Sequence, residues 1–398
     1  GVLPVFEKSH VDILVTGAGP VGLMAALRAA RAGNSVRVID RGVMTNQQSF
    51  ALALHPASLE LMKELGLADK MIDRGHPIRR VVFHEEASPE LGVDLTSIES
   101  DYPFALVLPQ NELEQILFDE LKKHKVKVEW NRELTEFEMT GDGVRARVGR
   151  LAEMPQGYAV SDFARVEQSS FHVTATNLIA ADGYRSTSRH LLHIPLKHYT
   201  KARHFIVFEF ETARHLEDEL RVEFTRGLTS FLWPMPHGRC RWTFEIDQKS
   251  RHPGVPTMKE LQEMLESRAP WFRAVPDKIS WAGRITFEGS HAQKFGLPPV
   301  WLAGDAAHLN LPAGVQSMNS GLQEAARITE LLAARDERSS SSGLFTQYER
   351  ERLDAWQWLL SDEDKPSGNE WAANHWRDIK AAIPATGDHL RGVLKNIG

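Results

Sequence analysis

The sequence predicts an α/β protein that combines a βαβ-based domain with a second domain rich in β-strands. Three observations predict this fold. A strand, a glycine turn, a helix and another strand follow one another near the N-terminus, residues 200–290 alternate between apolar and polar side chains, and the first pattern returns at residue 301. The chain has 398 residues, of which 42% are hydrophobic, so it can bury more than one core.

The first element is the stretch "VDILVTGAGPVGLMAALRAARAGNSVRVIDR", residues 11–41. It reads as an apolar strand, a glycine turn, an alanine-rich helix that stops at Gly33, and a second strand that ends at Asp40. Glycines in the spacing G-x-G-x-x-G allow a tight turn, the approach of a pyrophosphate and close helix packing. The residues of this turn are Gly17, Ala18, Gly19, Pro20, Val21 and Gly22. We therefore expect a Rossmann-type turn that binds a dinucleotide, with the Asp40 carboxylate accepting hydrogen bonds from a ribose.

The middle of the chain predicts a domain that is interrupted twice. Short β-rich pieces occupy about 75–108, and "NELEQILFDELKKHKVKVEW" then returns to helix and strand. Residues 200–290 alternate again and contain one helix, in "TMKELQEMLESRAPWF". We assign the first domain, with C-terminal helices, to 1–74, 109–190 and 285–398, and the second to 75–108 and 191–284. After about 362 the tail is polar, and we draw no functional prediction from it.

Two further motifs place carboxylates at predicted strand ends. "NLIAADGYRSTSR" contains Asp182-Gly183, which would also suit an ordinary turn, and "WLAGDAAHLNLPAGVQSMNSG" brings a strand to Gly304 and Asp305. A carboxylate at a buried strand end needs a polar partner, and the helix predicted to start near Val315 can favour a ring that becomes anionic on reduction. A flavin dinucleotide contains adenosine, pyrophosphate, a polyol chain and such a ring. We therefore expect FAD.

The three motifs, in this order, resemble those of the single-component (group A) FAD-dependent aromatic monooxygenases related to para-hydroxybenzoate hydroxylase. The resemblance extends from about 10 to 360 and implies an FAD domain of the glutathione reductase-like type. It implies that Asp40 and the adjacent Arg41 lie at the adenosine ribose, Leu134 near the adenine, and Gln110 near the phosphate and ribityl chain. Asp182 would link FAD and nicotinamide binding, and Asp305 would hold the ribityl chain. The residues implied to lie around the ring are Gly304, Pro312, Val315, Gln316, Ser317, Met318 and Asn319.

The resemblance also implies an activity. NADPH or NADH would reduce FAD, O2 would add to the reduced ring, and the hydroperoxide would hydroxylate an aromatic or polyketide-like small molecule. No catalytic side chain is predicted, because histidines such as His55 and His308 are more often surface or structural residues than acid–base groups. Other histidines of this kind are His204 and His237, and the strand aromatics that suit a core as well as a substrate pocket are Phe208, Phe210, Phe224, Phe231, Trp233 and Trp242, together with Met235.

Three residues depart from the family's usual pattern. Phe50 stands where the family often has arginine, which bears on nicotinamide docking, and Val315 and Ser317 replace glycines beside the proposed ring. Two alternatives therefore stay open: a flavin-dependent reductase on the same scaffold, and a flavin-binding protein without turnover. A plain NAD dehydrogenase would leave the second and third motifs unexplained. A flavin halogenase is disfavoured, because "FLWPMP" does not match the Trp-x-Trp-x-Ile-Pro element of such enzymes.

Composition excludes several other classes. A net charge of −6 and a pI near 6.3 argue against binding to nucleic acid or anionic membranes. The single cysteine, Cys240, excludes a disulfide framework and a redox dithiol, and no metal site is predicted. No apolar run approaches a membrane span of about 20 residues, and the start lacks the features of an export signal. We expect a cytoplasmic enzyme whose partners are small molecules, and we leave the oligomeric state open.

Overall fold

A mainly parallel sheet carries the glycine turn. The computed structural model describes residues 10–44, 51–156, 162–250, 252–274, 276–334 and 341–397, so Phe50 lies outside the described residues. The sheet has the order β19-β20-β11-β1-β2-β8, in which the neighbours from β20 to β8 pair in parallel. Its strands are β1 (His10–Thr16), β2 (Val36–Ile39), β8 (Val128–Glu129), β11 (Asp162–Ala180), β19 (Gly296–Leu297) and β20 (Val300–Leu302).

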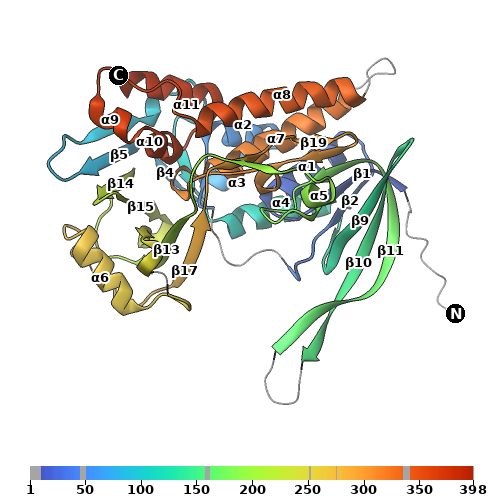
Figure 1. Cartoon of the computed structure of the whole chain (residues 1–398), viewed down its shortest axis with the longest axis horizontal. Helices are drawn as coiled ribbons and strands as arrows, with labels where there is room; N and C mark the ends of the chain where they lie inside the picture. The colour runs from blue at the N-terminus through green and yellow to red at the C-terminus, as the bar shows by residue number, and fades with distance from the viewer. Residues whose placement is uncertain are drawn as a thin grey trace.

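The same sheet continues into a long antiparallel extension. Strands β9 (Arg132–Thr140) and β10 (Gly143–Gln156) pair with each other, and β10 pairs along β11. In Figure 1 the far ends of β10 and β11 project away from the rest of the molecule. The near end of β11 is central to the parallel sheet, so one strand joins the extension to the core.

Helices pack around the parallel sheet. Helix α1 contacts α4 and α7, and α7 contacts α2 and α8. The alanine-rich face of α1 is buried, because small side chains let this helix lie close to the sheet and to α7. The helices of this layer are α1 (Pro20–Arg31), α2 (Pro56–Glu64), α3 (Ala68–Ile72), α4 (Gln110–Lys123), α5 (Thr187–Leu191), α7 (Gln316–Ala333) and α8 (Ser341–Leu360).

A second sheet of seven strands has the order β17-β13-β16-β15-β14-β5-β6. Helix α6 (Met258–Arg268) covers one face, where Phe208, Phe210 and Trp242 pack in a separate core; these aromatics are therefore core residues. The opposite face carries Trp233, whose indole donates to the Ala313 carbonyl at 3.1 Å. The strands are β5 (Arg80–Glu85), β6 (Leu91–Asp94), β13 (Arg203–Glu211), β14 (Glu219–Thr225), β15 (Leu228–Met235), β16 (Arg239–Ile246) and β17 (Trp281–Phe287).

The C-terminal helices pack against both parts of the molecule (Figure 1). They are α9 (Glu370–Asn374), α10 (Trp376–Ala382) and α11 (Gly387–Leu394). Two three-stranded sheets complete the fold: β3 (Ala53–Leu54), β7 (Ala105–Val107) and β4 (His76–Ile78), and β12 (Leu196–His198), β18 (Ser290–Ala292) and β21 (His308–Leu309). Within the described ranges, no helix combines the length and apolar character that a membrane crossing requires.

Candidate functional site

Four parallel strands end at the same edge of the first sheet. Thr16 is the register partner of both Ile39 and Ala180, and Ala180 is in turn the partner of Leu302. The residues that follow these strand ends within one to three positions therefore emerge at the same edge, and they include Gly17, Asp40, Asp182, Gly304 and Asp305. This edge, at the carboxyl ends of the strands, is where open α/β sheets bind ligands.

The three glycines of the turn have different structural roles. A Cβ on Gly17 would lie 2.0 Å from the Ala181 carbonyl oxygen, and one on Gly22 would lie 1.8 Å from the Gly17 oxygen, so the backbone itself requires both. Gly19 differs, because no atom lies within 4 Å of its absent Cβ. Its open side lies directly before α1, whose free N–H groups attract anions. The turn thus leaves room for a phosphate where one would be bound.

Asp40 fixes the turn from the neighbouring strand. One carboxylate oxygen accepts a hydrogen bond from the Ala18 N–H at 2.7 Å, and the other accepts from Gly42 N–H at 2.5 Å. Leu134 lies in the wall of the adjacent cavity, which has a volume of about 290 Å³. Other residues of that wall are Gly17, Gly19, Asp40, Arg41 and Asp182. The carboxylate therefore borders a cavity and also stabilises its rim.

The second motif forms a closed loop that supports the third. Asp182 accepts hydrogen bonds from the Ser186 hydroxyl at 2.5 Å and from the N–H and hydroxyl of Ser188 at 3.0 and 2.9 Å. Arg189, which is buried, donates to the Ala306 carbonyl at 2.8 Å. A charged donor on a buried carbonyl is a strong contact, so the second motif holds the backbone beside Asp305 in place.

The third motif contains a chain of polar contacts. The Ser317 hydroxyl donates to Asp305 Oδ1 at 2.7 Å and lies 3.0 Å from His308 Nδ1. His308 Nε2 lies 2.8 Å from Glu324, whose carboxylate also accepts from the Gly304 N–H at 2.9 Å. Removal from bulk water raises the pKa of Asp305 above its usual value, and the Ser317 hydrogen bond opposes this rise. Glu324 was not predicted from the sequence, because it lies within a helix with no motif around it, and the structure shows that it is fully buried.

A larger cavity, of about 440 Å³, follows the first. The two cavities share Gly19, Ala181 and Gly183, so they form successive parts of one groove. The wall of this second part includes the polar residue Asp305 and apolar residues such as Phe287. The predicted residues that line this larger cavity are Gly19, Pro20, Val21, Gln110, Asp305, Pro312, Val315, Gln316, Ser317 and Met318. The apolar residues are Ile285, Phe287, Leu309 and Leu311.

Four predicted residues border neither part of the groove. Ala18 bonds to Asp40, Gly22 packs on Gly17, and Gly304 packs on Val21. The side chain of the fourth residue, Asn319, is buried. Its oxygen accepts from His55 N–H and Ser58, and its amide donates to Ala53 and Val315. These residues hold the backbone around the groove.

The residues before α7 take an unusual backbone conformation. Val315 has φ 53° and ψ 35°, the left-handed region in which a β-branched residue is strained and glycine is not. His55 is fully buried and contacts the Gly314 carbonyl at 2.7 Å, and burial lowers its pKa to about 3. His55 is therefore a neutral structural donor at neutral pH. His204 lies beside Thr286, and His237 is exposed at a strand turn.

Residues after 362 also contribute to the site, which the sequence analysis did not predict. A Cβ on Gly314 would lie 2.3 Å from the Ala381 carbonyl oxygen, so the backbone of α10 packs directly under the loop that precedes α7. The buried residues Trp376, Ile379 and Ile383 anchor this segment. Their apolar spacing was the available signal in the sequence.

The groove and its three backbone turns define a protein that binds an extended dinucleotide. A family model described as "FAD binding domain" matches residues 10–362, and the chain therefore belongs to this family. This confirms the predicted family and fold class. The open side of Gly19, the carboxylates Asp40 and Asp305, and the length of the groove are consistent with FAD.

Curated relatives are similar over most of this chain. It is 29% identical over 361 residues to 6-methylpretetramide 4-monooxygenase of Streptomyces rimosus, covering 89% of this chain and 61% of the relative. It is 25% identical over 390 residues to pentachlorophenol 4-monooxygenase of Sphingobium chlorophenolicum, covering 96% of this chain and 68% of the relative. The chain thus spans about two thirds of the length of these relatives or less.

Solved structures show the same fold. The crystal structure of p-nitrophenol 4-monooxygenase from Pseudomonas putida DLL-E4 superposes with a TM-score of 0.75 at 19% identity, covering 98% of this chain and 97% of that one. Aklavinone-11 hydroxylase, in a ternary complex with FAD and aklavinone, gives a TM-score of 0.71 at 22% identity and covers 94% of this chain and 71% of that one.

Proposed function

We propose that this chain is an FAD-dependent monooxygenase that uses NADPH or NADH and O2 to hydroxylate an aromatic or polyketide-like small molecule. One observation carries the proposal: two adjoining cavities form one groove that borders all three motifs, and the lining of the larger cavity combines Asp305 with apolar residues such as Phe287. The names of the relatives support it, because they are monooxygenases of a tetracycline-type compound and of a chlorinated phenol.

The proposal assigns each part of FAD to residues of the groove. Asp40 would accept hydrogen bonds from the adenosine ribose, with Arg41 beside it and Leu134 against the adenine. The open turn at Gly19 and the start of α1 would bind the pyrophosphate. The remaining assignments follow the chain order: Gln110 and Asp305 for the ribityl chain, Asp182 for the link to nicotinamide, and the backbone of 315–319 for the ring.

Bound FAD would supply the two-electron chemistry and the activation of O2. The protein's part is to bind, to orient and to exclude water. Phe287 and the other apolar side chains of the wall would hold a planar substrate and keep water away from the reacting atoms. Residues Gln316, Ser317 and Met318 at the start of α7 line the same cavity, and the free N–H groups of this helix end would stabilise negative charge on the ring.

Asp305 and Ser317 would act together at the polar wall. Ser317 donates to one oxygen of the carboxylate, which fixes its orientation and leaves the other oxygen for a ribityl hydroxyl. Because Ser317 also contacts His308, which is held by Glu324, the orientation of Asp305 is set from inside the protein. The side chain that Ser317 carries, where the family has glycine, is in this way used for positioning.

The test starts with the purified protein reconstituted with FAD. NADPH and NADH oxidation is measured with a panel of phenols and polyketide-like aromatics under 18O2, and products are identified by mass spectrometry. We expect one hydroxylated product per nicotinamide oxidised, carrying one atom of 18O. Nicotinamide oxidation that yields a reduced product without 18O would identify a reductase. A protein that contains flavin but never oxidises nicotinamide would be a flavin-binding protein without turnover. A protein that does not retain flavin would instead support the NAD dehydrogenase alternative. A cytoplasmic location is part of the proposal, since reduced nicotinamide is supplied there.

A further inference from the structure

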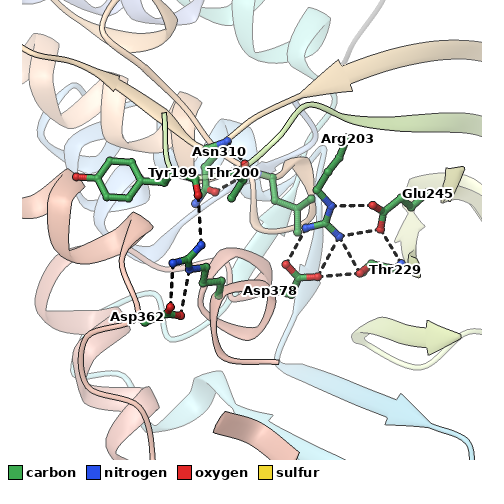
Figure 2. Close-up of polar contacts among 11 residues, drawn as sticks. Tyr199, Thr200, Arg203, Thr229, Glu245, Asn310, Asp362 and Asp378 are labelled. Carbon is green, nitrogen blue, oxygen red and sulfur yellow. Dashed lines mark hydrogen bonds and ion pairs between the residues drawn. The ribbon is translucent and has the colours of Figure 1, made fainter. Parts of the chain in front are cut away.

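A cluster of largely buried charges joins the second sheet to the C-terminal helices, and its charged side chains are not part of the groove lining (Figure 2). Arg203, on β13, makes paired contacts with two carboxylates. Its Nε and Nη2 donate to Glu245 at 2.8 and 2.7 Å, and its Nη1 and Nη2 donate to Asp378 at 2.7 and 3.0 Å. The Thr229 hydroxyl donates to Asp378 at 2.9 Å and its N–H donates to Glu245 at 2.8 Å.

The geometry of this cluster is specific. A guanidinium that is bidentate to two carboxylates fixes the positions of both, which a lysine could not do. The side chains of Arg203, Glu245 and Asp378 are 22%, 10% and 23% exposed, so solvent screens them little. Glu245 belongs to β16 of the second sheet, whereas Asp378 belongs to α10. The cluster thus holds α10 at a defined place against this sheet.

The same helix supports the loop that would face the FAD ring. The Gln316 side-chain amide donates to the carbonyls of Lys380 and Ile383 at 2.6 and 3.0 Å, and its oxygen accepts from Asn310 at 2.9 Å. The backbone of Ala381 lies directly under Gly314. Residues 310–316 are therefore attached to the segment that Asp378 anchors.

The cluster also adjoins the main cavity. A small cavity of about 20 Å³, enough for a single water molecule, lies between Arg203, Asp378 and Asn310. Phe287 and Leu311 belong to its wall and also to the wall of the main cavity. A shift of α10 would therefore reach the apolar wall as well as the loop.

We propose that Arg203 and Asp378 are positioning residues that set the distance between the second sheet and the loop 310–316. This inference rests on the proposed function, in which the sheet contributes to the substrate pocket and the loop contacts FAD. The pair would align the substrate with the ring and would have little effect on FAD retention, because it lies away from the glycine turn, Asp40 and Asp305.

The chain offers a matched control on the same helix. Arg377 makes a two-point ion pair with Asp362, at 3.0 and 2.8 Å, and both side chains are more exposed, at 43% and 44%. Figure 2 draws the contacts of Asp362 in the same view as the Arg203 cluster. The Arg377 pair joins α10 to the residues after α8, whereas the Arg203 pair joins it to the second sheet. Asp362→Asn removes one carboxylate from α10's contacts without touching that sheet.

The experiment compares Asp378→Asn, Arg203→Lys and Asp362→Asn with the wild type. We measure FAD affinity by fluorescence quenching, the visible circular dichroism of bound FAD, hydrogen exchange of residues 309–318 in the FAD-free protein, and product formed per nicotinamide oxidised. In Asp378→Asn and Arg203→Lys we expect an altered dichroism signal, faster exchange in the loop, and hydroxylation slowed about 10- to 100-fold. FAD affinity and substrate KM should stay within a few-fold of wild type.

Several results would overturn the inference. Wild-type dichroism, exchange and product yield in Asp378→Asn would do so. Altered dichroism, faster exchange and slower hydroxylation in Asp362→Asn would do so as well. If Asp378→Asn fails to fold, Arg203→Lys replaces it, because lysine keeps the charge and loses the two-point contacts; unchanged exchange and dichroism in Arg203→Lys would reject the positioning role. If no substrate is hydroxylated by the wild type, the proposed function fails, and exchange and dichroism still decide whether this pair positions the loop.

Discussion

Replacing Asp305 by asparagine is expected to weaken FAD binding while stabilising the FAD-free protein. Asparagine keeps the shape of the side chain and can still accept the Ser317 hydrogen bond, but it removes the charge. The carboxylate lies in the wall of the main cavity at the end of β20. The two effects have opposite signs, so they can be measured separately.

The size of the binding effect follows from the type of hydrogen bond. A hydrogen bond to a charged acceptor contributes about 1.5 to 3 kcal/mol and a neutral one about 0.5 to 1.5 kcal/mol, and 1.4 kcal/mol is a factor of ten. Asp305→Asn should therefore raise the Kd for FAD about 5- to 10-fold, and Asp305→Ala about 10- to 100-fold. The graded series separates loss of charge from loss of the whole contact.

The pH dependence gives a second measurement. Removal from bulk water raises the pKa of Asp305 in the folded protein above its unfolded value of 3.8. Its contribution to stability is therefore fully present below that unfolded value and is lost as pH rises through the raised pKa. At neutral pH the FAD-free Asp305→Asn protein should unfold at a higher temperature than wild type. FAD affinity of the wild type should rise as pH increases through the same range, and that of the variant should not.

The assay is an FAD titration between about pH 4.5 and 8, by quenching of flavin fluorescence, together with thermal unfolding of the FAD-free protein. Asp142→Asn, at an exposed position between β9 and β10, serves as a charge-matched control and should behave as wild type. Equal Kd values and equal pH profiles for wild type and Asp305→Asn would show that this carboxylate does not bind the cofactor. The reasoning from its place in the cavity would then be wrong.

Three further predictions concern single residues. Burial lowers the pKa of His55 to about 3, below its unfolded value of 6.5, so stability should fall as pH drops below 6.5, by about 3 kcal/mol at pH 4. Urea unfolding at pH 7 and 4.5 should show this loss in the wild type and not in His55→Gln. An equal fall in unfolding free energy between the two pH values in both proteins would contradict the prediction. Gly19→Val should fold normally, because no atom beyond the chain neighbours lies within 4 Å of the new Cβ, yet it should fail to bind FAD. Gly22→Ala should instead lose stability, because its Cβ would lie 1.8 Å from the Gly17 oxygen. Full FAD occupancy in Gly19→Val would rule out a phosphate at this turn. Cys240 is buried, which raises the pKa of its thiol, so a thiol reagent at neutral pH should label it after unfolding and not before.

The βαβ unit could be predicted from sequence because its determinants are local. Gly17 and Gly22 are required by contacts that lie within a few residues of the turn or at the adjacent strand end, and Asp40 follows directly from the end of β2. The second sheet was also predictable in kind, since alternation marks strands. Its partners were not, because β14 pairs in parallel with β5, more than a hundred residues earlier, and alternation contains no information about which strands become neighbours.

The residues that hold the site in place through long-range contacts could not be predicted from the sequence. Glu324 is a buried acid that looks like any other helical glutamate until His308 and the Gly304 N–H are placed beside it. Asp378 has the same property, since its partner Arg203 is 175 residues away. Long-range ion pairs leave no periodic trace in a sequence, so residues that act through them stay invisible in it.

Val315 and Ser317 were singled out by sequence, but their effects could be seen only in the structure. The family resemblance implied that both stand where glycine is usual, and the structure shows opposite consequences for the two positions. At Val315 the left-handed backbone would suit glycine, so valine adds strain of about 1 to 2 kcal/mol that the surrounding contacts offset. At Ser317 the backbone is helical and the added hydroxyl gains contacts with Asp305 and His308. Because that strain must be held by packing under the loop, the contacts of Gly314 and Gln316 with α10 are where we expect this protein to be least tolerant of change.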